Sequence, residues 1–285
     1  MENSVKHVKA MPNPLSKYFR QPAIYLKLPS RGKYWDEDAL EIPVTGEIPV
    51  YPMTSRDEIT LRTPDALMNG TSVVEVIQSC CPSIKNAWKM PSIDVDAVLI
   101  AIRIASYGNN MDVDTNCPKC NEENNNQVDL TSILAGLVVP DYNALLELDG
   151  LKIKLKPQKF LGVNRQNQIG YEEQKIMNSL NTIEENPEAK ADLIAKSMAR
   201  LVDLGQEIVA DSTEYIELPD DTQVTDRDFI LEFYRNANGS VMRRIQEVLA
   251  EKNKEAAIKN QKVQCSGCTN EYQVPLNFDY ANFFA

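Results

Sequence analysis

The stretches NCPKCN (residues 116–121) and QCSGCT (residues 264–269) decide the fold, because each holds a Cys-x-x-Cys pair in a tight turn. Such a turn directs two thiolates toward one point and leaves main-chain N–H groups free to support the sulfur atoms, as a tetrahedral zinc site requires. Two such turns supply the four ligands of one complete site. We therefore predict one structural zinc ion per chain, bound by Cys117, Cys120, Cys265 and Cys268.

The sequence around the two pairs indicates two copies of one half-site. MDVDT before the first pair and QKVQ before the second are typical of short strands. When the cysteines are aligned, Glu123 falls on Glu271 and, after a two-residue gap, Val128 falls on Val274. Four protein ligands leave no open coordination position, so we expect this zinc ribbon to be structural and to pin the end of the chain onto its middle.

Three alternatives to a zinc site remain open for the four cysteines. Two disulfides across the pairs would need an oxidising compartment, and the start MENSVKHVKAMPNP lacks the apolar centre of a signal peptide. A redox-active pair normally lies at a helix start, and neither pair is followed by helical sequence. Four unrelated thiols are the third alternative. Cys80 and Cys81 end an apolar helix before Pro82, and we expect them to be buried core thiols.

The composition is that of a folded protein with an acidic body and a basic start. The 285 residues are 43% hydrophobic and 25% charged, which suits one large domain or two ordinary ones. The formal net charge is −11, whereas residues 1–33 carry seven Lys and Arg side chains against one Glu. No run reaches the roughly 18 apolar residues of a membrane helix. These features argue against a protein that spans a membrane or mainly grips phosphate backbones.

Nothing in the sequence indicates a catalytic centre. The single histidine, His7, lies in the polar start, so catalysis by a buried imidazole is not expected. The chain has no GxxxxGK[ST], GxGxxG or GxSxG motif. Acidic pairs such as Asp94 and Asp96 are expected to be helix-start charges. We therefore predict that the protein is not an enzyme.

The rest of the pattern predicts an α+β fold in which an extended Pro-rich arm precedes a helical core, and a mostly helical C-terminal region includes a β-hairpin. In the helical core, SIDVDAVLIAIRIASYG is expected to be the central helix, with Ser92 as N-cap and Gly108 as its stop. Asp149-Gly150 predicts the tight turn of the hairpin. The predicted regions are 1–54 for the basic arm, 55–141 for the core with the first knuckle, 142–262 for the hairpin and helices, and 263–285 for the second knuckle and tail.

Helical spacing of apolar residues predicts four helices in the region 142–262. Pro187 is expected to open the second of these helices and Gly205 to close it. The four predicted ranges are 163–181, 187–204, 226–237 and 239–259.

Several strings in the first half of the chain resemble a bacteriophage family. PNPLSKYFRQPAIYLKLPSRGKYW, YPMT, RTPDALMNG and AIRIASYG, followed by CPKC, are similar to the baseplate hub assembly proteins of T-even-type contractile-tailed phages, over roughly residues 12–130. The resemblance implies a non-enzymatic tail assembly factor that helps to form the central hub near the tape-measure protein. It also implies a place in the host cytoplasm during assembly. The sequence leaves open whether the protein stays in the tail baseplate of the virion.

The Pro-rich arm offers a way to bind a hub or tape-measure protein. Extended segments restrained by proline lose little entropy on docking, so the arm can add a strand or apolar anchors to a partner. The open alternative is an arm packed on its own body. The alternative function is an intracellular zinc-ribbon adaptor that contacts nucleic acid. The acidic body argues against it, because negative side chains repel phosphates. The residues expected to contact the partner are Leu15, Tyr18, Phe19, Arg20, Ile24, Tyr25 and Leu26.

Overall fold

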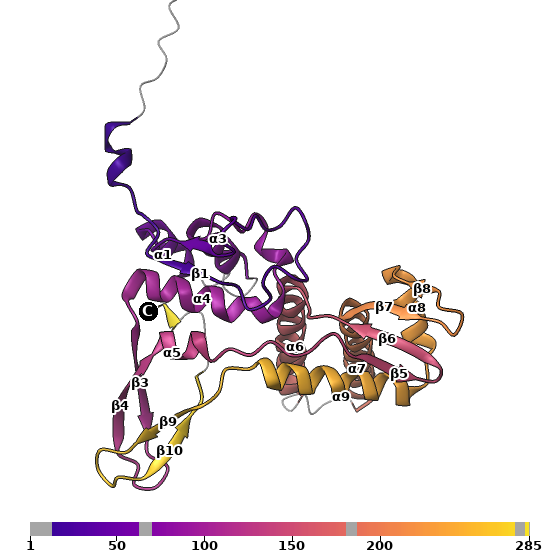
Figure 1. The fold of residues 1–285 in the computed structure, drawn as a ribbon. Helices are drawn as coiled ribbons and strands as arrows, with labels where there is room; N and C mark the ends of the chain where they lie inside the picture. Colours follow the sequence, from indigo (N-terminus) through magenta and orange to yellow (C-terminus); the bar gives the residue numbers. More distant parts are fainter. Residues whose placement is uncertain (1–12, 63–69, 181–186, 277–282, 285) are drawn as a thin grey trace, which may run out of the picture.

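The computed structural model describes residues 13–62, 70–180, 187–276 and 283–284, and it shows helices and strands gathered around two hydrophobic cores (Figure 1). This confirms the predicted α+β class. The start of the basic arm, part of the string RTPDALMNG, the predicted helix end at residue 181 and most of the C-terminal tail lie outside the described residues.

Helix α4 (Ser92–Tyr107) is the centre of the first unit, as its sequence predicts. Apolar residues cover most of its faces, and a helix of this kind has to be surrounded by other elements. Pro91 takes the N-cap position expected for Ser92, and the helix ends at Gly108, whose φ is 90°. The buried side chains of α4 include Val95, Val98, Leu99 and Ile102.

Short helices surround α4. Helices α3 (Thr71–Cys80) and α5 (Leu130–Ala135) pack against α4, and α1 (Ser55–Leu61) packs against α3. Cys80 and Cys81 at the end of α3 are fully buried, which confirms their assignment as core thiols.

Most of the described part of the predicted arm belongs to this first unit. Strand β1 (Ile24–Leu26) pairs antiparallel with β2 (Ile48–Val50), and Leu26 and Leu28 lie in the first core. The interpretation of 1–54 as one arm is therefore corrected, because alternate apolar residues of this stretch bury one face against the core. The 3-10 helix η1 (Pro14–Tyr18) stands off the body (Figure 1) and contains no buried residue.

The two cysteine turns join the strands of two antiparallel hairpins. Strands β3 (Asn110–Asn116) and β4 (Glu123–Asp129) form the first hairpin, and β9 (Gln261–Gln264) and β10 (Glu271–Val274) form the second. Both hairpins lie side by side at one end of the first unit (Figure 1). The chain thus returns from the second unit to the first, as the sequence predicts.

The second unit is a four-stranded antiparallel sheet with long helices. The order is β5-β6-β7-β8, in which β5 is Leu145–Leu148, β6 is Leu151–Leu155, β7 is Thr213–Glu217 and β8 is Gln223–Val224. Asp149 and Gly150 join β5 to β6 with φ values of 51° and 80°, which confirms the predicted tight turn. Strands β7 and β8 were not expected, since their short run lies between two strong helical patterns.

The helices of this unit are α6 (Phe160–Leu180), α7 (Pro187–Asp211), α8 (Arg227–Asn236) and α9 (Gly239–Ala256). Helix α7 begins at Pro187 as predicted but continues through Gly205, so that stop signal was wrong. A glycine inside a helix costs about 1 kcal/mol, which a long helix tolerates. A Cβ at Gly205 would lie 3.2 Å from Gln246 Nε2, so the glycine lets α9 approach α7 closely.

The two units are joined by direct packing. Trp88 of the 3-10 helix η2 (Ala87–Lys89) stacks on Phe160, with ring centroids 5.7 Å apart, and the Phe160 N–H donates to the Met90 carbonyl at 2.7 Å. Tyr34 and Tyr142 meet edge to face at 5.8 Å. Among the helices in the described ranges, none combines the length and the apolarity needed to cross a membrane.

Candidate metal centre

The two cysteine turns have the same backbone geometry. In the first, the Cys117 N–H donates to the Glu122 carbonyl at 2.9 Å and the Asn121 N–H donates back to the Cys117 carbonyl at 2.9 Å. In the second, Cys265, Asn270 and Thr269 repeat this pattern at 2.9 and 3.0 Å. The residue after each pair is left-handed, with φ of 61° at Asn121 and 56° at Thr269. The two turns are therefore two copies of one half-site.

The strand register supports the alignment made from sequence. Glu123 opens β4 opposite Asn116, and Glu271 opens β10 opposite Gln264. In both hairpins, the residue immediately before the first cysteine thus pairs with the glutamate that follows the turn.

The four cysteines come together although about half of the chain separates the two pairs. All four Sγ atoms lie within 4.8 Å of one another. Two distances that cross between the turns are 3.7 Å, from Cys117 to Cys268, and 3.6 Å, from Cys120 to Cys265. Zn–S bonds of about 2.3 Å in a tetrahedron place sulfur atoms roughly 3.8 Å apart. The cluster therefore fits a single tetrahedral metal ion.

Disulfides and a redox-active pair fit the structure less well than a metal ion does. All four cysteines are free thiols, and the cross-turn distances are far longer than a disulfide bond of about 2.05 Å. Strands, not helices, follow both pairs, so the arrangement of a redox-active pair is missing from this part of the structure.

Asn124 holds the second turn against the first and was not identified from the sequence. Its Oδ1 accepts hydrogen bonds from the Ser266 N–H at 2.8 Å and the Ser266 Oγ at 2.9 Å, and its Nδ2 donates to the Cys265 Sγ at 3.6 Å. The stretch NEENNN (residues 121–126) has the polar composition of an exposed turn, but its last four residues lie in β4 and Asn124 is only 6% exposed. Alternation along a strand places Asn124 on the same face as Val128, which is the signal that could have revealed it.

The surroundings of the four sulfur atoms give the thiols different pKa values. The backbone N–H of Cys268 is the main cause that lowers the pKa of Cys265 to about 6, while burial opposes it. At Cys120, the backbone N–H of Glu122 lowers the pKa, but neighbouring thiols and burial outweigh it and raise the pKa to about 12. Cys265 is thus a thiolate near neutral pH, whereas Cys120 keeps its proton until a bound metal cation displaces it.

The residues expected to bind a partner are divided between surface and core. Leu15, Tyr18, Phe19 and Tyr25 are exposed, at 61%, 74%, 57% and 63%. Leu26 is buried in the first core and Ile24 is half-buried beside it, so Leu26 cannot meet a partner, and this expectation is corrected.

Arg20 lies at the root of the projecting segment and is bound to the body. Its guanidinium donates to the Pro52 carbonyl at 2.7 Å, to the Ser79 carbonyl at 2.8 Å and to the Asp57 carboxylate at 3.3 Å. These bonds connect the arm with α1 and α3. Arg20 therefore fixes the point from which the segment leaves the body.

The comparisons with known proteins give one result. No curated protein and no solved structure matches the chain. A family model described as T4 bacteriophage base plate protein matches residues 22–285, which is nearly the whole chain and includes both cysteine turns. This match shows that the chain belongs to the T4-type bacteriophage baseplate protein family.

Proposed function

We propose that this baseplate protein works in the central hub of the phage tail, as a structural component or an assembly chaperone, by binding other tail proteins such as a hub or tape-measure protein. In this proposal it is not an enzyme. It acts in the host cytoplasm during assembly and is placed at the tail baseplate. The family match supports the baseplate role, and the exposed apolar segment before Arg20 supports binding to a protein.

The exposed segment is the observation that carries the proposal. Leu15, Tyr18 and Phe19 present large apolar surfaces on or next to η1, which stands off the body (Figure 1). Asn13 caps η1 by accepting from the Leu15 N–H at 2.9 Å, and Arg20 anchors its root. A segment that is already ordered at its base loses less entropy on docking than a free tail. Aromatic anchors of this kind dominate the energy of many interfaces.

We also propose that Cys117, Cys120, Cys265 and Cys268 hold one structural zinc ion. When bound, the ion would supply four bonds that lock the two hairpins together, and it would offer no open position for substrate. The residues of the chain prepare this site, because backbone N–H groups and Asn124 support the sulfur atoms from both turns. The closed site would then keep α9 and the second unit in a fixed position relative to the first.

Co-expression with the candidate hub and tape-measure proteins, followed by affinity purification, tests the proposed function. The variant L15S/Y18S/F19S should lose the partner. The control variant V44S/V202S/F229S removes three exposed apolar side chains elsewhere and should retain it. Equal recovery of the partner by both variants would contradict a role for the projecting segment. Steep salt-dependent binding of duplex or single-stranded DNA would instead support a nucleic-acid adaptor.

A further inference from the structure

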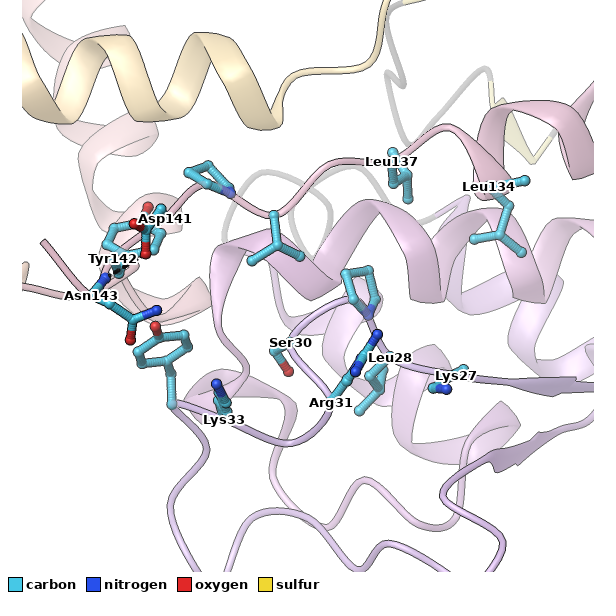
Figure 2. A pocket seen from close by; sticks show the side chains of 15 residues that line it. Lys27, Leu28, Ser30, Arg31, Lys33, Leu134, Leu137, Asp141, Tyr142 and Asn143 are labelled. Carbon is cyan, nitrogen blue, oxygen red and sulfur yellow. Dashed lines mark hydrogen bonds between the residues drawn. The ribbon is translucent and has the colours of Figure 1, made fainter.

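A trough with a mostly cationic lining crosses the junction of the two units. Its first part, about 670 Å³, lies between residues 27–34 and 134–143 (Figure 2), and its second part, about 620 Å³, lies beside residues 154–159. The two parts share Lys33, Tyr34 and Asn143, so they form one continuous trough. The cationic residues of the lining are Lys27, Arg31, Lys33, Lys154, Lys156 and Lys159. Its acidic residues are Asp36, Asp141 and Glu214.

Three of these cations are available for a partner. Lys27, Arg31 and Lys33 are exposed and form no ion pair with any residue in the described ranges. By contrast, Lys159 pairs with the Asp36 carboxylate at 3.1 Å. Unpaired cations gathered on one wall are notable in a chain of net charge −11, and they favour an anionic partner.

The loop that carries Arg31 and Lys33 is held in place by a buried carboxylate. Asp94 of α4 accepts hydrogen bonds from the Ser30 N–H at 2.8 Å and from the Trp35 indole N–H at 2.7 Å, and the Ser30 hydroxyl also donates to it. Asp94 lies in the first turn of α4, as expected for a helix-start charge, and it is fully buried.

The backbone of this loop is also unusual. Arg31 and Tyr34 have positive φ values of 53° and 67°, which non-glycine residues adopt only when the surroundings hold them there. Gly32 lies between them with φ of 79°, and a Cβ on it would be 2.3 Å from the Ile42 Cδ1. The cations are therefore presented by a preorganised loop, which reduces the entropy cost of binding.

The facing wall of the first part of the trough is apolar. It consists of the end of α5 and the segment that follows it, where Leu134, Leu137 and Val139 line the trough. Figure 2 shows Leu134 and Leu137 across from the loop that carries Arg31 and Lys33. Val139 is 36% exposed. Successive side chains of an extended chain point to opposite sides. An extended segment lying in this trough would therefore place acidic residues toward the loop and apolar residues toward this wall.

The aromatic residues of the trough do not suit nucleic acid. Binding of single strands depends on exposed aromatic faces on which bases stack. Here the ring of Tyr142 is buried, lies against Tyr34 and has the Lys252 ammonium over it at 4.9 Å. The carboxylates of Asp36 and Asp141 would repel the continuous row of phosphates in a nucleic acid. The acidic side chains of a peptide are separated from one another, so they can contact the cations without approaching Asp36 and Asp141.

We propose that this trough binds an extended segment of another tail protein in which acidic and apolar residues alternate. Its carboxylates pair with Lys27, Arg31 and Lys33, and its apolar side chains lie on Leu137 and Val139. The inference rests on the proposed function only in naming a tail protein as the source of the segment. The site itself is argued from the trough alone.

A direct binding assay with purified full-length protein tests the trough. The probe is a fluorescein-labelled ten-residue peptide of alternating Glu and Val, and the comparison peptide alternates Lys and Val. Fluorescence anisotropy should show binding of the Glu peptide that weakens with added salt, and no binding of the Lys peptide. The trough variant K27E/R31E/K33E should weaken binding about tenfold or more. The control variant K175E/R243E/K262E changes the net charge equally outside the trough and should change binding less than about twofold.

Three results would overturn the proposal. The first is equal binding of the Glu peptide by the trough and control variants, because the cations would then not be the site. The second is binding of a labelled single-stranded oligonucleotide, but not the Glu peptide, in a manner that K27E/R31E/K33E abolishes. The third is self-association of the protein that the same variant abolishes, without peptide binding, because the occupant would then be a second copy. The assay contains no tail partner, so its failure would leave the pull-down of the proposed function standing.

Discussion

Loss of one cysteine ligand should remove the connection between the two ends of the chain. In the proposed site, one ion joins Cys117 to Cys268, which lie 151 positions apart, and Cys120 to Cys265, which lie 145 positions apart. A cross-link that closes a loop of about 150 residues restricts the unfolded chain by about 5 kcal/mol at 25 °C in the chain-entropy treatment. We therefore expect Cys265→Ser and Cys117→Ser each to lower the free energy of unfolding by about 5 kcal/mol.

Urea unfolding with and without a chelator measures this effect. The fluorescence of Trp35 and Trp88 reports on the first unit, and mass spectrometry of the reduced protein reports the metal content. The chelator should destabilise the wild-type protein by about as much as either substitution does, and it should have no further effect on the variants. Lys119→Ser changes an exposed side chain in the same turn and should alter stability by less than about 0.5 kcal/mol.

Clearly unequal losses for the two cysteine variants would refute the reasoning, because a single ion held by both pairs has to be lost in either case. Wild-type protein that contains no metal and does not respond to the chelator would refute it as well. Unequal losses would point to separate sites, whereas the absence of metal would mean that the two hairpins are held together by their hydrogen bonds and packing alone.

Four further predictions concern single residues. Asn124→Ala should lower stability by about 1–3 kcal/mol and weaken metal binding in competition with a chelator, because the hydrogen bonds between the two turns are lost. Burial raises the pKa of Asp94 against the hydrogen bonds that it accepts. Relative to a non-titrating Asp94→Asn variant, its contribution to stability should thus be largest below the unfolded pKa of about 3.9 and be lost as pH rises through the folded pKa, as urea midpoints from acid to neutral pH will show. Gly170→Ala, with open space around its Cβ, should raise the melting temperature by adding up to about 1 kcal/mol. Gly205→Ala should raise the melting temperature by a smaller amount, because the flexible end of the Gln246 side chain has to move.

The cysteine turns were predictable because their information is local. A Cys-x-x-Cys turn needs few residues, and the repeat of strand, turn and glutamate is visible in the sequence on both sides of Cys117 and Cys265. Helix α4 and the turn at Gly150 were predictable for the same reason, since apolar coverage and positive φ at an Asp-Gly pair are properties of short stretches. In these places the local preference and the final structure agree.

The errors lie where distant residues decide. Gly205 was a reasonable helix stop, but α9 packs against α7 at that point and the helix continues. The proline-rich stretch around Leu26 is typical of a free arm, but β2 and the first core cover it. Asp94 lies at a helix start as expected, but its burial under the loop at Ser30 and Trp35 was not predicted. None of these partners is near in sequence.

The amino-acid sequence by itself thus determined the two half-sites, the central helix, the hairpin turn and the acidic character of the body, because each depends on residue types within one short segment. The tertiary structure alone decided that Asn124 joins the two half-sites and that the cations of one loop face an apolar wall across a trough. Such pairings depend on the free energy of packing whole elements together, and no local preference contains that information.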